Sequence, residues 1–257
     1  MANEVATKDS FSFALTTQLE TINDALPNGF NKTRFVQNAI ALLNDNADLQ
    51  KYGRSQLMMG LMKGATLGLD FFSKEAYLVP YGNKLQYQTS YTGSVKLAKK
   101  YSIRPIKDIY AKIVRGGDEF EELIEHGEQT INFKPKAFNN GKVVGAFAVC
   151  LFKDGGIQYD TMSLSELENT RKHSKASNSP AWKDFTEEMY KKTVLKRLCK
   201  HIEIDFENTE QLRVYDEETA VETDPKIIAE QQIAEEANQV DLMDAGIIDA
   251  DAEEVFK

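Results

Sequence analysis

Apolar residues recur every three to four positions in the first part of the chain, which is the spacing of one helix face. The stretch that begins at Phe11 shows this spacing clearly, and Pro27 and Gly29 mark its end. Residues 1–10 are polar, and we expect them to be disordered. The pattern predicts three helices, over Phe11–Leu26, over Lys32–Asn44 with Asn31 as its cap, and over Arg54–Gly68.

The middle of the chain changes to stretches of the kind that form β-strands. Gly82 and Asn83 separate two of them and predict a hairpin, in which Pro80 lies at an edge or a bulge. Residues 154–156, Asp-Gly-Gly, predict a second turn. We expect a short helix over Tyr91–Tyr101. The predicted strands are Tyr77–Tyr81, Leu85–Gln88, Ile103–Val114, Gln129–Phe133, Val143–Phe152 and Ile157–Thr161.

Helical signals return after these strands. Ser163 and Glu166 have the spacing of a capping box, which predicts a helix as far as Arg171. Pro180 suits the first turn of a long helix that we expect to reach Ile202. Helices followed by antiparallel strands and further helices predict an α+β fold. It would have N-terminal helices, a small antiparallel sheet with packed helices, and a flexible acidic C-terminal tail.

Charge divides the chain into a basic body and an acidic tail. The 257 residues include 31 Lys and Arg and 40 Asp and Glu, a net charge of -9. Residues 205–257 hold 17 of the acidic and 3 of the basic residues, which leaves 28 basic and 23 acidic residues before them. Such asymmetry accompanies nucleic-acid binding or partner contacts, and it equally suits a solvated tail. We expect an N-terminal arm and helix over 1–30, a core over 31–205, a linker over 206–224 and an acidic interaction tail over 225–257.

Several classes of protein are disfavoured by the sequence. It has no apolar run long enough to span a membrane and no secretory signal at its N-terminus. Cys150 and Cys199 lie far apart and do not indicate a disulfide framework, which favours the cytoplasm. A phosphate-binding loop is missing, and His126, His173 and His201 lack zinc-ligand spacing with the cysteines. We therefore expect no catalytic residue, no metal and no cofactor.

Two basic clusters carry the candidate chemistry. In the first, lysines three and four residues apart share a face of the helix predicted over Tyr91–Tyr101, and tyrosines are interleaved with the cluster. Single-strand-binding proteins use cations along the phosphates and rings beneath the bases. The second cluster carries lysines four apart on the last predicted helix, although each lysine also suits a solvated face, and Trp182 suits packing. The candidate DNA-binding residues are Lys84, Gln86, Gln88, Tyr91, Lys96, Lys99, Lys100, Arg104, Lys107, Lys112 and Arg115, then Arg171, Lys172, Lys175, Lys191, Lys192, Lys196, Arg197 and Lys200.

Several short segments, taken in their order and spacing, resemble the RecT family of phage single-strand annealing proteins. They are Leu67–Asp70, Ala76–Gly82, Gln86–Gly93, Val143–Gly155 and Pro180–Leu198, within a likeness that covers Phe35–Ile204. The resemblance implies that the chain anneals complementary single-stranded DNA in phage or prophage homologous recombination, without ATP. It also implies a homo-oligomer in the form of a ring or helical filament, and a partner 5′-to-3′ exonuclease. The implied core is distantly similar to the Rad52 annealing fold, and the implied tail contacts partners such as the host single-strand-binding protein.

Two other functions stay open at this point. A metal-dependent phage nuclease needs carboxylates that converge on a metal beside a lysine, and Asp154 or Asp160 with Lys153 would have to fill that role. A regulator of lysogeny would prefer a specific duplex site, yet the sequence shows no helix-turn-helix signature. The glutamates between residues 119 and 125 are expected to form a solvated face.

Overall fold

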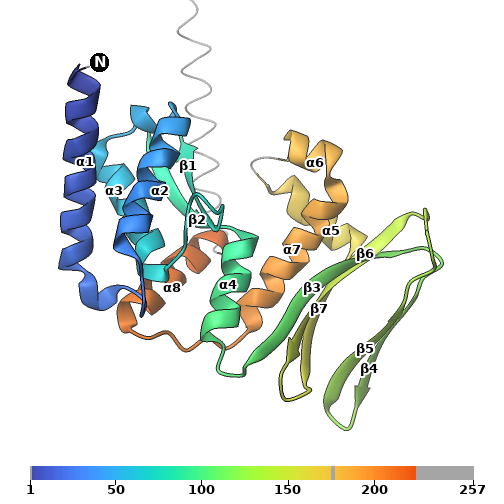
Figure 1. Ribbon diagram of the computed structural model, residues 1–257. Helices are drawn as coiled ribbons and strands as arrows, with labels where there is room; N and C mark the ends of the chain where they lie inside the picture. The colour runs from blue at the N-terminus through green and yellow to red at the C-terminus, as the bar shows by residue number, and fades with distance from the viewer. Residues whose placement is uncertain (1, 175–176, 224–257) are drawn as a thin grey trace, which may run out of the picture. The chain divides into compact units, whose positions relative to one another are not determined.

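The computed structural model describes residues 2–174 and 177–223, and contacts within the chain divide it into two units (Figure 1). One unit combines Met1–Thr89 with Glu207–Lys257, and the other is Ser90–Phe206. Helices and small antiparallel sheets occur in both, which confirms the α+β class. The acidic tail predicted over 225–257 lies outside the described residues. No helix in the described ranges is long and apolar enough to cross a membrane.

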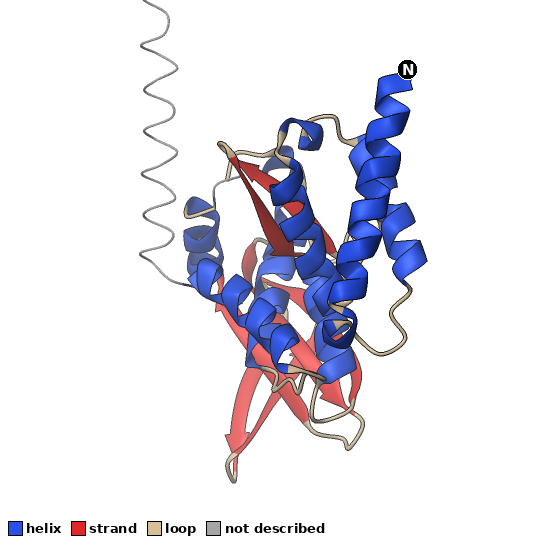
Figure 2. Ribbon diagram, turned by 90° about the vertical axis from the view of Figure 1, so that its left-hand side faces the viewer, coloured by secondary structure: helices blue, strands red, loops and turns tan. Residues whose placement is uncertain are grey.

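Helices dominate the first unit, and its strands form one hairpin (Figure 2). Asn31 accepts a hydrogen bond from the backbone amide of Arg34 and caps its helix, as predicted. A Cβ atom on Gly60 would lie 2.4 Å from Leu78, so this glycine allows α3 to approach β1 closely. The elements are α1 (Ala2–Thr21), α2 (Lys32–Asp45), α3 (Arg54–Leu67), β1 (Ala76–Tyr81), β2 (Lys84–Thr89) and α8 (Thr209–Thr223), with short 3-10 turns at Asn23–Ala25 and Leu49–Lys51.

Two segments of the first unit differ from the prediction. Residues 2–10 were expected to be disordered but begin helix α1, since they contain no Pro or Gly to stop a helix that continues into an apolar stretch. Residues 209–223 were expected in a linker but form helix α8, which packs on α3 and buries Val214. Its acidic residues have specific partners: Glu217 lies 3.1 Å from Lys63, and Glu218 accepts a hydrogen bond from the Thr89 amide.

The second unit is built on a three-stranded antiparallel sheet with helices on one face and a hairpin on the other. The central strand β6 (Val143–Phe152) lies between β3 (Ile106–Arg115) and β7 (Ile157–Ser163). The hairpin strands extend away from this sheet (Figure 1). The remaining elements are α4 (Tyr91–Tyr101), α5 (Leu164–Lys172), α6 (Pro180–Asp184) and α7 (Thr186–His201), and the hairpin strands β4 (Glu119–Glu125) and β5 (Glu128–Lys134).

Alternation along β6 directs its side chains into two separate cores. Ala146 and Ala148 belong to the core that includes the helices, where their small size lets α7 pack against the sheet. Phe147 faces the opposite side and is covered by Phe120 and Phe133 of the hairpin, with ring centroids 5.2 and 5.0 Å from its own. The sheet therefore separates a helical face from a hairpin face.

The long helix predicted from Pro180 to Ile202 is divided in two. Phe185 leaves the helical conformation, with φ −128° and ψ 41°, and separates α6 from α7. The Thr186 hydroxyl donates to the Trp182 carbonyl across this break. Trp182 is buried in the core, which confirms its expected packing role. Because of the break at Phe185, Trp182 lies on α6 and the lysines of the second cluster lie on α7.

The prediction also missed strand β4. Its glutamates were expected to form a solvated face, and Glu119, Glu121 and Glu122 are indeed exposed, but this segment was not expected to form a strand. Phe120 pairs with Phe133 in the register of that hairpin and packs on the sheet, which explains why this acidic segment is a strand. The capping box at the start of α5 is confirmed, because Ser163 and Glu166 each accept from the other's backbone amide.

Candidate nucleic-acid interface

The candidate DNA-binding residues are spread over both units. Lys84, Gln86 and Gln88 lie on β2 of the first unit, where the Gln88 amide donates to the Tyr81 hydroxyl at 2.8 Å. The other described candidates lie in the second unit, and Lys175 is outside the described residues. The first cluster of the sequence is thus divided between two parts of the molecule.

Helices α4 and α7 bring together the largest group of candidate lysines. The two helices pack against each other and contribute Val95, Ala98, Val194 and Leu198 to one core beneath them. Because these apolar faces point toward the sheet, the lysine-bearing faces point away from it. Tyr91 starts α4 with an exposed ring. The lysines are Lys96, Lys99 and Lys100 on α4 and Lys191, Lys192, Lys196 and Lys200 on α7.

All four arginines of the second unit have acidic partners. Three of these pairs connect different elements, so that each guanidinium helps to fix one part of the unit against another. The Arg104 guanidinium also lies 4.0 Å from the centroid of the Phe152 ring. The N–O distances are 2.9 Å for Arg104–Asp154, 2.5 Å for Arg115–Glu187, 3.6 Å for Arg171–Glu168 and 2.5 Å for Arg197–Asp160.

The remaining lysine candidates lie on α5 and β3. Lys172 is exposed at the end of α5, and Lys107 is exposed near the start of β3. Lys112 is exposed farther along β3 and pairs in register with Phe147, which places it on the hairpin face of the sheet.

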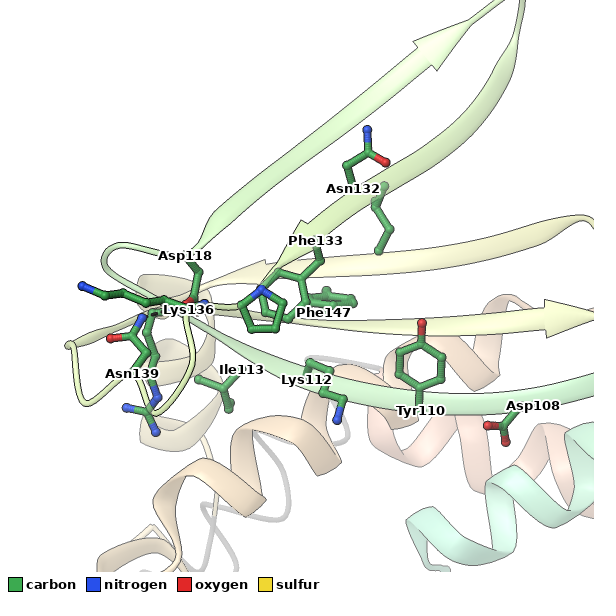
Figure 3. Close-up of a pocket in the computed structure, with 13 residues that line it drawn as sticks. Asp108, Tyr110, Lys112, Ile113, Asp118, Asn132, Phe133, Lys136, Asn139 and Phe147 are labelled. Atoms are coloured by element: carbon green, nitrogen blue, oxygen red, sulfur yellow. Dashed lines mark hydrogen bonds between the residues drawn. The ribbon is translucent and has the colours of Figure 1, made fainter.

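A groove of about 880 Å³ opens on this hairpin face, between β3 and the loop and strand that end the hairpin (Figure 3). Figure 3 shows Tyr110 and Lys112 on β3, with Asn132 and Phe133 across the groove on β5. Its lining includes Tyr110, Lys112, Ile131, Asn132, Phe133, Pro135, Lys136 and Phe147, together with Asp108, Arg115, Asp118 and Asn139.

The two carboxylates in the groove are already compensated. Hydrogen bonds from the Lys99 ammonium and the Ile109 amide hold the pKa of Asp108 below its usual value. The pKa of Asp118 is lowered by hydrogen bonds from the Asn139 side chain and from two backbone amides. Both groups therefore stay ionised with their charges directed at donors of the protein.

The sequence prediction did not single out Lys136 or the loop that carries it. Pro135 and Gly141 are turn signals that bound this loop, but nothing in the sequence indicates that it closes a groove beside β3. The groove beside β3 became apparent only from the tertiary structure.

The family is decided by comparison with known proteins. The model of the RecT family matches residues 33–240, which is more than half of the chain. The chain belongs to the RecT family. The RecT resemblance of the short sequence segments is thereby confirmed.

Two relatives of this RecT-family chain show how far the likeness extends. The protein RecT of Escherichia coli (strain K12) is 34% identical over 157 residues, which cover 58% of this chain and 55% of that protein. The uncharacterized protein YqaK of Bacillus subtilis (strain 168) is 28% identical over 172 residues, which cover 65% of this chain and 58% of that protein. The chain therefore matches little more than half the length of either relative.

The carboxylates considered for a nuclease have other partners in this RecT-family chain. Asp154 is bound by Arg104, and Asp160 is bound by Arg197 on a different element. Across residues 2–174 and 177–223, no three His, Cys, Asp or Glu side chains gather as a metal site would require. Burial raises the pKa of Cys150 to about 11 and that of Cys199 to about 12, so neither thiol is activated as a thiolate.

Proposed function

We propose that this chain binds single-stranded DNA and anneals it to a complementary strand, as a non-enzymatic protein of phage homologous recombination. The observation that carries the proposal is the pair of neighbouring lysine-bearing helices, α4 and α7, in a chain of the RecT family. Lysines spaced along a surface bind phosphates without regard to base sequence. Recognition is then left to the bases of the second strand.

The proposed mechanism needs no source of chemical energy. The lysine faces of α4 and α7 hold the phosphates of the first strand and leave its bases available for Watson–Crick pairing. Because pairing is downhill, ATP is not required. Oligomerisation aligns many short sites, and a matched duplex then gains contacts along its whole length. The acidic segment after residue 224 supplies the contacts with an exonuclease or a host single-strand-binding protein in this proposal.

Two complementary fluorescent oligonucleotides, added one after the other without ATP, test this function. We expect fast duplex formation, with both strands intact on a denaturing gel. Single-strand binding without annealing would show that the protein only covers single-stranded DNA, and it would contradict the proposal. Shortened strands would instead indicate a nuclease.

Replacing Lys192, Lys196 and Lys200 together by alanine tests the α7 surface. Each phosphate contact to a single strand contributes about 0.7 to the slope of log affinity against log salt concentration, so three lost contacts should lower the slope by about 2. The matched control removes the same charge from exposed lysines elsewhere, namely Lys51, Lys74 and Lys153. Equal affinities and slopes for wild type and the α7 variant would place the DNA away from this helix.

A further inference from the structure

We propose that the groove between β3 and the hairpin is a second binding site for single-stranded nucleic acid. It lies on the opposite face of the sheet from α4 and α7. The inference rests on the proposed function and adds that one protomer holds two strands on two separate surfaces. Its evidence is the floor of the groove, its charge and the loop at its end.

The floor of the groove is aromatic and firmly held. Tyr110 and Lys112 pair in register with Val149 and Phe147, so all four side chains face the hairpin side. Phe147 is only 2% exposed, whereas Tyr110 is half-buried and keeps part of its ring accessible. An accessible ring on a rigid floor is a surface on which an unstacked base can lie.

The free charge at the groove is positive. Lys112 and Lys136 are exposed, and neither ammonium group has an ion-pair or hydrogen-bond partner within the described ranges. Asp108 and Asp118 are compensated by donors of the protein, and Arg115 is bound by Glu187. The lysines are therefore the groups left to attract an anion, and a phosphate beside a base supplies one.

The loop that supplies Lys136 and Asn139 to the groove also carries an exposed ring, Phe138, which lies beside the groove and is not part of its lining. Asp118 accepts hydrogen bonds from the Lys136 amide and the Asn139 side chain, and Asn139 also accepts from the Gly141 amide. Between these anchors, Phe138 is 99% exposed and has a φ of 53°, a left-handed conformation that bulky residues rarely adopt. A fully exposed ring on an anchored, unfavourable backbone indicates that it contacts a ligand.

These features together match a single strand better than a duplex. Rings can stack on bases only where the bases are unpaired, and lysines bind the adjoining phosphates. The glutamates Glu119 and Glu121 of the hairpin do not line the groove and would not oppose the phosphates there. The groove and the apolar faces of α4 and α7 lie on opposite sides of the sheet, and Lys99 of α4 reaches Asp108 at the rim of the groove. The groove therefore raises the concentration of a second strand close to the first.

A two-strand capture experiment on the full chain tests this site. Limiting protein is bound to an oligothymidylate on beads, so that each protomer occupies its stronger site on that strand. A labelled oligothymidylate, which cannot pair with the first, is then added and its retention is measured. We expect wild type to retain it. Lys112→Ala with Lys136→Ala, and separately Phe138→Ala, should lower the affinity for the labelled strand by about five-fold or more.

The controls separate this inference from the proposed function. Phe72→Ala removes an exposed ring of the first unit, Lys51→Ala with Lys153→Ala removes two exposed charges, and both control variants should behave as wild type. Phe138→Tyr should restore retention, because it restores the ring. If wild type binds and anneals but never retains the labelled strand, or if the groove variants retain it fully, the second site is refuted while annealing stands. Failure to bind the first strand would refute the proposed function itself.

Discussion

Replacing Arg197 by methionine tests whether a predicted phosphate ligand instead holds α7 on the sheet. The Arg197 guanidinium donates to both carboxylate oxygens of Asp160, at 2.5 and 2.6 Å, and to the Thr161 carbonyl of β7. Asp160 has a side chain that is only 15% exposed. Methionine preserves most of the apolar stem and removes only the charged fork.

The expected loss of stability follows from the state of the Asp160 carboxylate, which would lose the hydrogen bonds from Arg197. A hydrogen bond to a charged group contributes about 1.5–3 kcal/mol, and the carboxylate would lose both donors in a place that water reaches poorly. The Arg197 side chain is 36% exposed, so water entering beside it would recover part of this loss. We therefore expect the free energy of unfolding of the second unit to fall by about 2 kcal/mol, an estimate scaled from the per-bond range.

The assay uses a reporter that the chain already contains. Trp182 is the single tryptophan of the sequence and is buried in the core of the second unit, so its fluorescence in urea follows the unfolding of that unit. The double variant Asp160→Ala with Arg197→Met should lose less free energy of unfolding than the sum of the two single variants, because no carboxylate is left unpaired. A loss below about 0.5 kcal/mol, together with a salt slope for DNA binding reduced by about 0.7, would refute the reasoning and make Arg197 a phosphate ligand.

Two further predictions concern element ends. Ser163→Ala should lower the free energy of unfolding, obtained from thermal melting, by about 1 kcal/mol, because it removes the cap of α5. Hydrogen bonds from Ser163 hold the pKa of Glu166 below 4.5. The ionised carboxylate therefore stabilises the fold above pH 4.5, and this stabilisation is lost as the pH falls through the folded pKa. In the alanine variant, the free energy of unfolding should depend less on pH in this acidic range. Deleting residues 224–257 should leave the melting temperature of the remaining chain, measured by circular dichroism, unchanged. Deleting from residue 207 onward should lower this melting temperature, because α8 and its buried Val214 are lost. Equal melting of the two truncated chains would contradict the packing of α8.

Much of the secondary structure could be predicted because local pattern and tertiary environment agree there. Strand β6 and helix α4 begin and end at the predicted residues, since β6 is apolar on both of its faces and α4 carries a clear apolar face toward a core. Strand β4 and helix α8 were missed for a common reason. Both are acidic, and the contacts that order them are distant in sequence, as the packing of Phe120 on Phe147 and the pairing of Glu217 with Lys63 show.

The candidate site was less predictable than the fold, because a cation in a sequence does not reveal its partner. Arg104 and Arg197 have the same local signature as the lysines around them, yet their carboxylates come from 50 and 37 residues away along the chain. The groove could not be predicted from the sequence for a similar reason. Lys112 and Lys136 meet at it only because β3 and the loop after β5 are brought together by the packing of the hairpin.

The division of labour between the two kinds of cation follows from their chemistry. A guanidinium forms a planar fork that binds a carboxylate through two parallel hydrogen bonds, so it is suited to fixing one element against another. An ammonium group is a compact, mobile charge that follows a phosphate in many orientations. In the second unit all four arginines take acidic partners. Some lysines do so as well, since Lys99 pairs with Asp108 and Lys191 with Glu188, and lysines line both the α4–α7 surface and the groove. A surface of lysines binds any sequence alike, which is what a protein needs if only the complementary strand is to choose the base pairs.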